Sequence, residues 1–394
     1  MGKTIVSLVS DQTIPNVMFI KAIGDAERLV FITTKGMENN GRTYWILKSV
    51  GVKSSNKIIP HEIIIVSEQS ISEIKAELSK HSFFEGNGEI IVNLTGGNKI
   101  MFLAAYEFFK EKSSQSQNII NMYYLPIGKD KFDKVFPSEE NNCIDTYLCN
   151  LKEYLTAYSI EQGKGGKNPL VKFEETKEFY IETFNSEKGK NIIKNLRKKW
   201  EDIKEDIKKK KLPNRDEYNK SLNGLLGDED IKGLIKKAFG TFDINEPRLK
   251  YLAAGGWFEE YVYFLIQRGL KLKDEQICLN FEMEDKSHYH KTPPNEIDVI
   301  FIYKNKINII ECKTGLKNQS NNDILQQVLY KQSALKKGFG LTAKSFLFLP
   351  YGLSGNKNNK ERAVIYGIDI VDDQKMLLDE DRFKSEFLEK NKLV

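Results

Sequence analysis

Asp298, Glu311 and Lys313 are the residues whose types and spacing are best suited to chemistry in this sequence. Two carboxylates can supply the oxygen ligands that a hard divalent cation prefers. A lysine beside them can steady a hydroxide or a phosphate. The set therefore indicates metal-dependent chemistry on a phosphate ester, provided that folding brings the three side chains together. The alternative is structural, with the lysine in a salt bridge to one carboxylate at the end of a strand.

A β-hairpin is the element that would bring these side chains together. Two runs rich in β-branched residues flank the polar turn at 304–306, which is a hairpin pattern. Folding at this turn places Asp298 opposite or next to Glu311. The two-residue period of a strand puts Glu311 and Lys313 on one face and Cys312 on the other. An apolar hairpin has no structural need for such a cluster, whereas a divalent cation does.

This arrangement resembles the core of the PD-(D/E)xK nucleases. In that resemblance Asp298 is the first carboxylate, Glu311 the second and Lys313 the lysine, and Glu-Ile-Asp stands where the family name has Pro-Asp. The resemblance implies that Asp298 and Glu311, with the carbonyl of Cys312, hold Mn²⁺ or Mg²⁺. Glu259, at the start of an upstream helix, either contributes to this catalytic site or is an ordinary surface carboxylate.

A helix is expected at 323–337, downstream of the hairpin. Gln326 and Tyr330 resemble a Q-x-x-x-Y element of some nucleases with this fold. One helical turn separates them, so both could reach the phosphates of one strand. Leu325 and Val328 indicate that the same helix also packs against a core.

Length and composition set the broad class of the protein. The 394 residues suggest two or three domains, and a content of 40% hydrophobic and 29% charged residues is ordinary for soluble globular protein. No apolar run is long enough to cross a bilayer and no signal peptide precedes the first expected strand, so we expect a cytoplasmic protein without a membrane partner. The four cysteines lack C-x-x-C spacing, which predicts neither a zinc site nor a disulfide framework. His288 and His290 are expected in a solvated loop, and the net charge of +5 permits a nucleic-acid partner without requiring one.

The first 150 residues alternate strand and helix signals, which predicts a mostly parallel, doubly wound sheet. Strands are expected at 5–9, 29–33, 63–66, 90–94 and 119–125, and helices at 17–26, 44–50, 71–84 and 99–110. Ligands of such sheets lie beyond the carboxyl ends of the strands, where the strand order reverses. Two unusual polar loops are expected at that edge, at 10–16 and 93–99.

The second of these loops has the composition of an anion site. Gly96 and Gly97 allow the backbone to approach a bulky group, Thr95 and Asn98 supply neutral donors, and Lys99 supplies charge. The helix that follows directs its free N–H groups to the same place, which favours phosphate. The alternative is a plain glycine turn with a helix cap.

The rest of the chain divides into two further segments. From about 143 the sequence turns helical, with one helix expected at 145–158 and an amphipathic helix from Ile192 to Ile207. Between residues 188 and 211, eleven basic residues stand against four acidic ones, so this face either neutralises phosphates or is the solvated surface of a connecting helix. The α/β order returns from Tyr251, with a helix at 255–265, strands at 276–284, 345–349 and 363–368, and the hairpin and helix described above. The expected units are therefore 1–150, 151–250 and 251–394.

The two outer units together resemble one known family. Thr-Gly-Gly-Asn-Lys at 95–99 after a Rossmann strand resembles the CRISPR-associated Rossmann-fold (CARF) sensor domain. Gly-Trp-Phe-Glu at 256–259, followed by the hairpin and its Glu-Cys-Lys at 311–313, resembles the nuclease half of CARF-linked effectors of type III CRISPR systems. The resemblance covers about 1–150 and 250–370. It implies a Rossmann-like CARF domain, a helical connecting region and a restriction-endonuclease-like α/β domain.

The resemblance also implies a function. A homodimer of CARF domains would bind a cyclic oligoadenylate, cyclic tetra-adenylate above all, across its two-fold axis. Binding would activate metal-dependent cleavage of single-stranded RNA and DNA, with nicking of duplex DNA as a further option, in antiviral defence. The residues implied to contact the ring are Ser10, Asp11, Gln12, Thr13, Asn16, Thr33, Thr34, Thr95, Gly96, Gly97, Asn98 and Lys99. Asp11 is unusual beside a polyanion and would instead cap a helix or hold a ribose hydroxyl.

Two other functions fit parts of the sequence. One is a DNA-repair or restriction-type nuclease that acts independently of a cyclic nucleotide. The other is a CARF-type transcription regulator that binds DNA through the basic middle segment without cleaving it. The joint presence of Asp298, Glu311 and Lys313 argues against the regulator.

Overall fold

The structure is a computed structural model of the 394-residue chain. It describes residues 2–51, 59–82, 87–138, 142–163, 166, 168–184, 186–208, 224, 227–239, 251–286, 295–314, 322–352 and 357–393. The expected loop around His288 and His290 lies outside these residues.

A seven-stranded sheet forms the core of the amino-terminal unit. Its order is β3-β2-β1-β4-β5-β6-β7, with β1 to β5 parallel and the last two strands antiparallel. The strands are β1 (Lys3–Leu8), β2 (Arg28–Thr33), β3 (His61–Ile65), β4 (Glu89–Asn93), β5 (Ile119–Tyr124), β6 (Lys131–Phe136) and β7 (Cys143–Asp145). The doubly wound parallel sheet is therefore confirmed, and β6 and β7 extend it beyond the sequence prediction.

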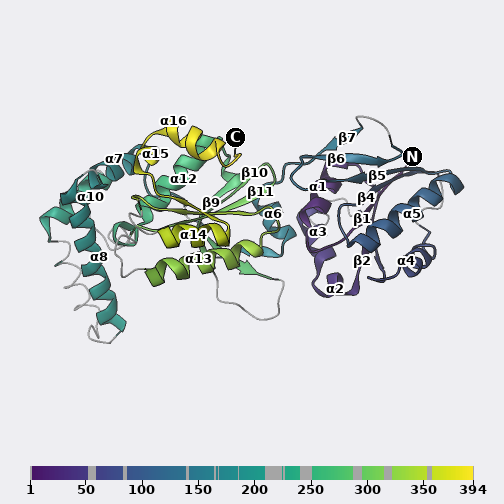
Figure 1. Cartoon of the computed structure of the whole chain (residues 1–394), viewed down its shortest axis with the longest axis horizontal. Helices are drawn as coiled ribbons and strands as arrows, with labels where there is room; N and C mark the ends of the chain where they lie inside the picture. Colours follow the sequence, from purple (N-terminus) through teal and green to yellow (C-terminus); the bar gives the residue numbers. More distant parts are fainter. Residues whose placement is uncertain are drawn as a thin grey trace.

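Helices cover both faces of this sheet (Figure 1). Alternate residues of β1 show the two sides: Ile5 belongs to the cluster that includes α1 and α3, and Val6 to the cluster beneath α4 and α5. The helices are α1 (Ile14–Ile23), α2 (Lys35–Asn39), α3 (Arg42–Val50), α4 (Ile71–Leu78) and α5 (Lys99–Gln115). Burial on both faces explains why these strands read as continuous apolar runs. The strand order reverses between β1 and β4, so the loops that follow these two strands lie at the same edge.

A six-stranded mixed sheet forms the second core, in the order β13-β12-β11-β10-β9-β8. Its strands are β8 (Ile160–Gln162), β9 (Ile277–Asp285), β10 (Asn295–Tyr303), β11 (Lys306–Cys312), β12 (Lys344–Phe348) and β13 (Ile368–Val371). The hairpin is confirmed: β10 and β11 are antiparallel, and Val299 lies opposite Ile310. This register continues to Asp298 opposite Glu311, as the sequence predicted.

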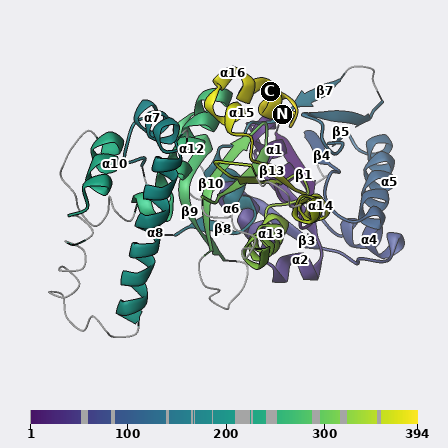
Figure 2. The ribbon, with the colours of Figure 1, turned by 60° about the vertical axis from the view of Figure 1, so that its left-hand side comes forward.

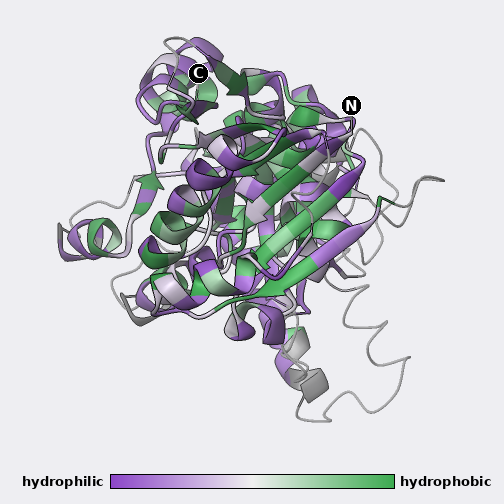
Figure 3. Ribbon diagram, turned by 90° about the vertical axis from the view of Figure 1, so that its right-hand side faces the viewer, coloured by the Kyte–Doolittle hydropathy of each residue, from purple (hydrophilic) through white to green (hydrophobic). Residues whose placement is uncertain are grey.

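The helices of the second unit form two layers. Its larger core cluster includes residues of α7, α8 and α12, while the cluster of Leu325 and Leu329 lies beneath α13 and α14. The helices are α7 (Phe173–Phe184), α8 (Glu187–Lys208), α10 (Glu229–Phe239), α12 (Gly256–Leu270), η1 (Asp274–Gln276), α13 (Asn322–Lys337), α14 (Lys357–Tyr366), α15 (Gln374–Leu378), α16 (Glu380–Arg382) and η3 (Phe383–Glu389). Figure 2 shows α8 at the end of the molecule away from the first sheet. Figure 3 shows the green, apolar strands inside helices of mixed character.

Two of the predicted elements are wrong in detail. The strand expected at 363–368 is mostly the end of α14, and the strand β13 begins only at Ile368. The helix expected at 145–158 is a strand end and loop followed by the shorter α6 (Leu151–Ala157). Within the connecting region 151–250 the structure adds one short strand, β8, which pairs with β9 at the edge of the second sheet.

The two units share a buried contact through α6, which lies between the sheets in Figure 1. One apolar cluster runs from the first sheet through α6 to the second sheet. Tyr154 Oη donates to the carbonyl oxygen of Phe339 at 2.8 Å. Gln12 Oε1, in the loop after β1, accepts from Tyr158 Oη at 3.0 Å and from Leu341 N at 3.2 Å. A loop of the first unit therefore contacts the α13–β12 loop of the second directly.

Gly340→Ala tests this contact. Gly340 has a φ of +89°, and a Cβ there would lie 2.4 Å from Tyr158 Oη and 3.0 Å from Gln12 Oε1. The left-handed backbone alone costs an alanine about 1–2 kcal/mol, and displacing the Tyr158 hydroxyl adds about 1 kcal/mol. Gly128→Ala is the matched control, since Gly128 has a φ of +82° with open space around it. Urea unfolding should show the larger loss for Gly340→Ala; equal losses would mean that the contact adds nothing to stability.

Candidate active site and sensor loops

The hairpin gathers the three residues that the sequence singled out. Lys313 Nζ lies 2.5 Å from Glu311 Oε1 and 3.9 Å from Asp298 Oδ2. Asp298 is 8% exposed and Glu311 3% exposed, so both carboxylates are withdrawn from bulk water. The structure thus brings these three side chains together, as the sequence predicted.

Backbone and side-chain donors fix the two carboxylates. The backbone N–H of Cys312 donates to Asp298 Oδ2 at 2.7 Å, across the hairpin. Gln332 Nε2, from α13, donates to Glu311 Oε2 at 2.9 Å. Lys331 Nζ lies 4.0 Å from the same oxygen. Each carboxylate therefore has a donor of its own besides Lys313.

Burial and mutual repulsion shape the protonation of this cluster. Burial, and then the charge of Glu311, raise the pKa of Asp298 to about 7, against the lowering effect of Lys313. Burial lowers the pKa of Lys313, but Asp298 and Glu311 outweigh it, so the pKa of Lys313 is above its ordinary value. Clustered groups with strongly shifted pKa values are characteristic of functional sites.

The donor set fits a hard divalent cation. Asp298 and Glu311 present carboxylate oxygens from opposite strands, and the raised pKa of Asp298 reflects first its burial and then the charge of Glu311, both of which a bound cation would offset. Oxygen ligands of this kind suit Mg²⁺ and Mn²⁺. No group of three or more His, Cys, Asp or Glu side chains in the described part of the chain is placed to hold a metal ion. The fit therefore rests on two carboxylates, with the carbonyl of Cys312 and water as the remaining oxygens.

Glu259 faces this cluster from α12. Burial, and then the charge of Asp298, raise the pKa of Glu259 well above its ordinary value. Its helix starts at Gly255, whose φ is +97° and where a Cβ would lie 2.7 Å from Thr314 Oγ1. The glycine thus lets the start of α12 pack against the residue that follows Lys313. The position of Glu259 is consistent with its predicted contribution to the site.

Gln332 and Lys331 are site residues that the sequence analysis missed. Gln326 and Tyr330, which resembled a nuclease element, are exposed on α13, and Gln326 accepts from Arg362 instead. The signal for Gln332 was its place in the apolar stripe of α13, one turn after Val328, where a polar side chain is unexpected.

The predicted ligand contacts lie in the two loops at 10–16 and 93–99, called the sensor loops below, and at Thr33 and Thr34. Their burial divides them into two groups. Those with exposed or partly exposed side chains or backbone are Ser10, Asp11, Gln12, Thr95, Gly97, Asn98 and Lys99. Asp11 Oδ1 accepts from Arg42 Nη2 at 2.9 Å, which neutralises its charge. Asn98 caps α5 by accepting from Met101 N at 2.9 Å, so the helix cap that the sequence allowed is present, and Lys99 is exposed at the first position of the helix.

The second group is buried. Thr13 Oγ1 donates to the carbonyl oxygen of Ala157, and Thr34 caps α2. Gly96 packs so closely that a Cβ there would lie 2.0 Å from the carbonyl oxygen of Leu8. Asn16 Oδ1 and Thr33 Oγ1 are buried and have no hydrogen-bond partner among the residues that the structure describes. The members of this group are Thr13, Asn16, Thr33, Thr34 and Gly96.

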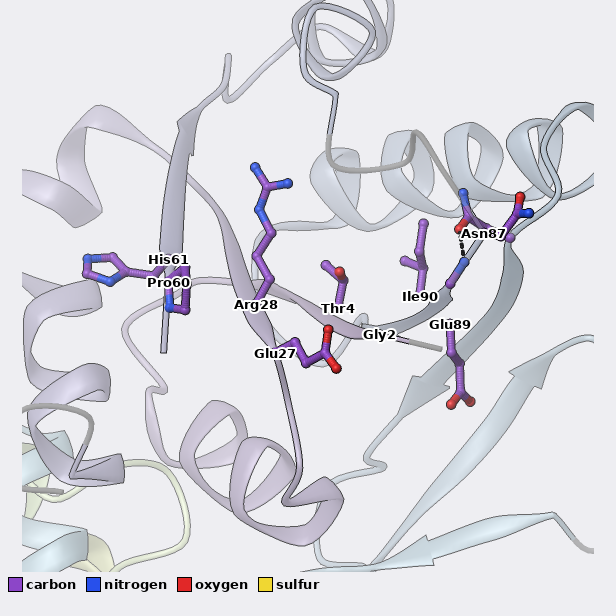
Figure 4. A pocket seen from close by; sticks show the side chains of 11 residues that line it. Gly2, Thr4, Glu27, Arg28, Pro60, His61, Asn87, Glu89 and Ile90 are labelled. Carbon is purple, nitrogen blue, oxygen red and sulfur yellow. Dashed lines mark hydrogen bonds between the residues drawn. The ribbon is translucent and has the colours of Figure 1, made fainter. Parts of the chain in front are cut away.

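A pocket of about 570 Å³ lies at the opposite edge of the first sheet, at the amino ends of its strands. Figure 4 shows Glu27, Arg28, His61 and Glu89 around it. None of its lining residues comes from the two sensor loops, so it is separate from the predicted ligand edge.

Family comparisons identify both units. Residues 4–154 match the family described as Card1 CARF domain, and residues 246–386 match the family described as Card1-like, endonuclease domain. The chain joins a CARF domain to a Card1-like endonuclease domain. The first sheet is therefore its CARF domain, and the second sheet with the Asp298 cluster is its endonuclease domain. No curated protein matches the sequence.

Solved structures share the fold over nearly the whole chain. Protein VC1899 from Vibrio cholerae aligns with a TM-score of 0.71 at 18% identity, covering 99% of this chain and 98% of that one. Can2 from Sulfobacillus thermosulfidooxidans, solved with cyclic tetra-adenylate, aligns with a TM-score of 0.63 at 20% identity, covering 96% and 95%. A type III CRISPR defence DNA nuclease activated by cyclic oligoadenylate aligns with a TM-score of 0.51 at 15% identity, covering 89% of this chain and 46% of that one. No helix within the described residues has the length and apolar character needed to cross a membrane.

Asp298→Asn tests the electrostatics of the endonuclease cluster. The folded-state pKa of Asp298 is raised from 3.8 to about 7, so the folded protein binds more protons than the unfolded chain between these values, and stability falls as pH rises through that window. Asparagine keeps an acceptor for Cys312 N and cannot ionise. In EDTA at pH 8 the variant should melt higher than wild type, by about 2–4 °C per kcal/mol gained, and the advantage should shrink towards pH 5.

The control for this experiment is Asp369→Asn, because Asp369 is exposed on β13. Its melting temperature should follow that of wild type at both pH values. If the melting temperature of Asp298→Asn at pH 8 is equal to or below that of wild type, burial and repulsion do not destabilise the paired carboxylates as argued here.

Proposed function

We propose that this protein is an endonuclease that cyclic tetra-adenylate activates, acting in type III CRISPR antiviral defence. Its substrates are single-stranded RNA and DNA, and its active form is a homodimer. The family matches support the pairing of a CARF domain with an endonuclease domain. The convergence of Asp298, Glu311 and Lys313 at the end of one hairpin is the observation that carries the nuclease assignment.

The chemistry follows from the charges in the cluster. Asp298, Glu311 and the carbonyl of Cys312 would hold Mg²⁺ or Mn²⁺. When bound, the ion lowers the pKa of a coordinated water and offsets charge on the phosphate. Lys313 stays protonated at neutral pH because its pKa is raised by the carboxylates, so it stabilises phosphate charge and does not act as a base. Glu259, at the start of α12, would add a metal ligand or support the two carboxylates from the neighbouring helix.

The sensor assignment rests on the switch-point edge of the CARF sheet. The loops after β1 and β4 meet there, Lys99 is exposed, and the N-terminus of α5 adds positive potential. A two-fold-symmetric ring of nucleotides matches an isologous homodimer. Asn16 Oδ1 and Thr33 Oγ1 are buried without partners in the described part of the chain. A rearranged, ligand-bound edge would satisfy these polar atoms.

Substitution of Glu311 tests the nuclease site. Glu311→Gln keeps the size of the side chain and removes its charge, so cleavage should fall by about 10²–10⁴-fold, equivalent to about 3–5 kcal/mol in the barrier. The assay follows labelled single-stranded RNA and DNA on gels, with Mn²⁺ and cyclic tetra-adenylate. Glu284→Gln is the control, since Glu284 is a partly exposed strand carboxylate of the same sheet. Full activity of Glu311→Gln would refute the site.

Substitution of Lys99 tests the sensor. Lys99→Ala removes one charge-assisted contact to the activator, worth about 1.5–3 kcal/mol, so half-maximal activation should need at least about tenfold more cyclic tetra-adenylate, with the maximal rate unchanged. Lys110→Ala, on the exposed surface of the same helix, should behave as wild type. If the cleavage rate of the wild-type protein does not change with cyclic tetra-adenylate, a ligand-independent nuclease is favoured instead. Duplex binding without cleavage would favour a regulator.

A further inference from the structure

Gln332 is a fully buried polar residue among apolar ones. It is 0% exposed, and its neighbours in the stripe of α13, Leu329 and Leu335, are also buried. A primary amide in such surroundings is costly unless its hydrogen bonds are made. An apolar residue would serve the packing of this helix better, so the amide needs another reason.

Both ends of the Gln332 amide are bonded. Nε2 donates to Glu311 Oε2 at 2.9 Å, and Oε1 accepts from Ser345 Oγ at 2.7 Å. Ser345 is 1% exposed and lies on β12, the strand parallel to β11. Because the Ser345 hydroxyl donates to Oε1, the amide is held with its N–H₂ group towards the carboxylate.

The consequence falls on the two oxygens of Glu311. Oε2 is tied to α13 through Gln332, while Oε1 lies on the side of Lys313, 2.5 Å from its Nζ. The side chain is thereby kept from rotating, and Oε1 lies beside the ammonium group of Lys313, which is itself 3.9 Å from Asp298 Oδ2. Hydrogen bonds that orient a ligand in this way commonly change metal affinity or activity 10–100-fold when they are removed.

We propose that Gln332, fixed by Ser345, is a positioning residue that presents Glu311 Oε1 to the cation and phosphate. The inference rests on the proposed nuclease function and extends it to a residue outside the carboxylate–lysine motif. It also makes the site depend on the spacing between α13, β11 and β12, because the three bonded residues lie one on each of these elements.

The test uses substitutions that keep volume and change one group. Gln332→Met removes the donor at nearly constant length, Gln332→Glu sets a second carboxyl group against Glu311, and Ser345→Ala frees the amide to turn. Gln327→Met is the matched control, since Gln327 lies on the exposed face of the same helix. Thermal unfolding checks that each full-length variant is folded; if Gln332→Met is not, Ser345→Ala carries the test.

Two measurements are read together. Calorimetric titration with Mn²⁺ should give a dissociation constant about 10–100-fold weaker for Gln332→Met and about fivefold weaker for Ser345→Ala, the effect of one ordinary hydrogen bond. Cleavage by Gln332→Met at saturating Mn²⁺ should show a lower kcat with the KM for the nucleic acid unchanged. Gln327→Met should match wild type in both measurements.

A crystal structure of Gln332→Met gives a readout that does not depend on activity. We expect the Glu311 carboxylate to turn away from the position described here. Two results would overturn the positioning role while leaving the nuclease assignment intact. One is a Glu311 carboxylate in the same position as in wild type, and the other is a Gln332→Met variant that binds Mn²⁺ as tightly as wild type. A wild-type protein that neither binds Mn²⁺ nor cleaves would refute the proposed function instead, and the crystal structure would still decide the role of Gln332.

Discussion

The structure of the endonuclease domain depends on two carboxylates that are buried opposite each other at the end of a hairpin, because neighbouring groups must offset their charge. Burial of Asp298, and then the negative charge of Glu311, raise the pKa of Asp298 to about 7. The fold offsets this cost with the ammonium group of Lys313, the N–H of Cys312 and the amide of Gln332. Such a cluster adds nothing to stability that apolar residues would not add better. The cluster instead has the charges that the metal and phosphate chemistry proposed above requires.

The endonuclease domain is joined to the CARF domain through the apolar cluster around α6 and through specific hydrogen bonds. Gln12, in the loop at the switch-point edge of the CARF sheet, bonds to Tyr158 and to the backbone of Leu341. Leu341 lies in the loop between α13 and β12, and these two elements carry Gln332 and Ser345. A shift of the sensor loop would therefore act on the elements that hold Glu311. This gives a physical form to the proposed activation, as a coupling between two packed domains.

Local patterns in the sequence were sufficient for some features and not for others. The hairpin and its register followed from the turn at 304–306 and the two-residue period, so the carboxylates and Lys313 were predictable together. The strand expected at 363–368 is wrong. The β-branched residues Val364 and Ile365 favour a strand by type, but the structure places them in α14, where they are 76% and 79% exposed. β8 pairs with β9, more than a hundred residues away in the sequence, and Gln332 bonds to Glu311, about twenty residues away. No local period in the sequence encodes such contacts.

The most direct measurement is a crystal structure of the protein soaked in Mn²⁺, with anomalous diffraction used to place the metal. We expect one strong peak between the carboxylates of Asp298 and Glu311, within about 2.0–2.3 Å of an oxygen of each, with Lys313 beside it. A manganese peak at another place, or carboxylates splayed apart with no metal between them, would contradict the central claim.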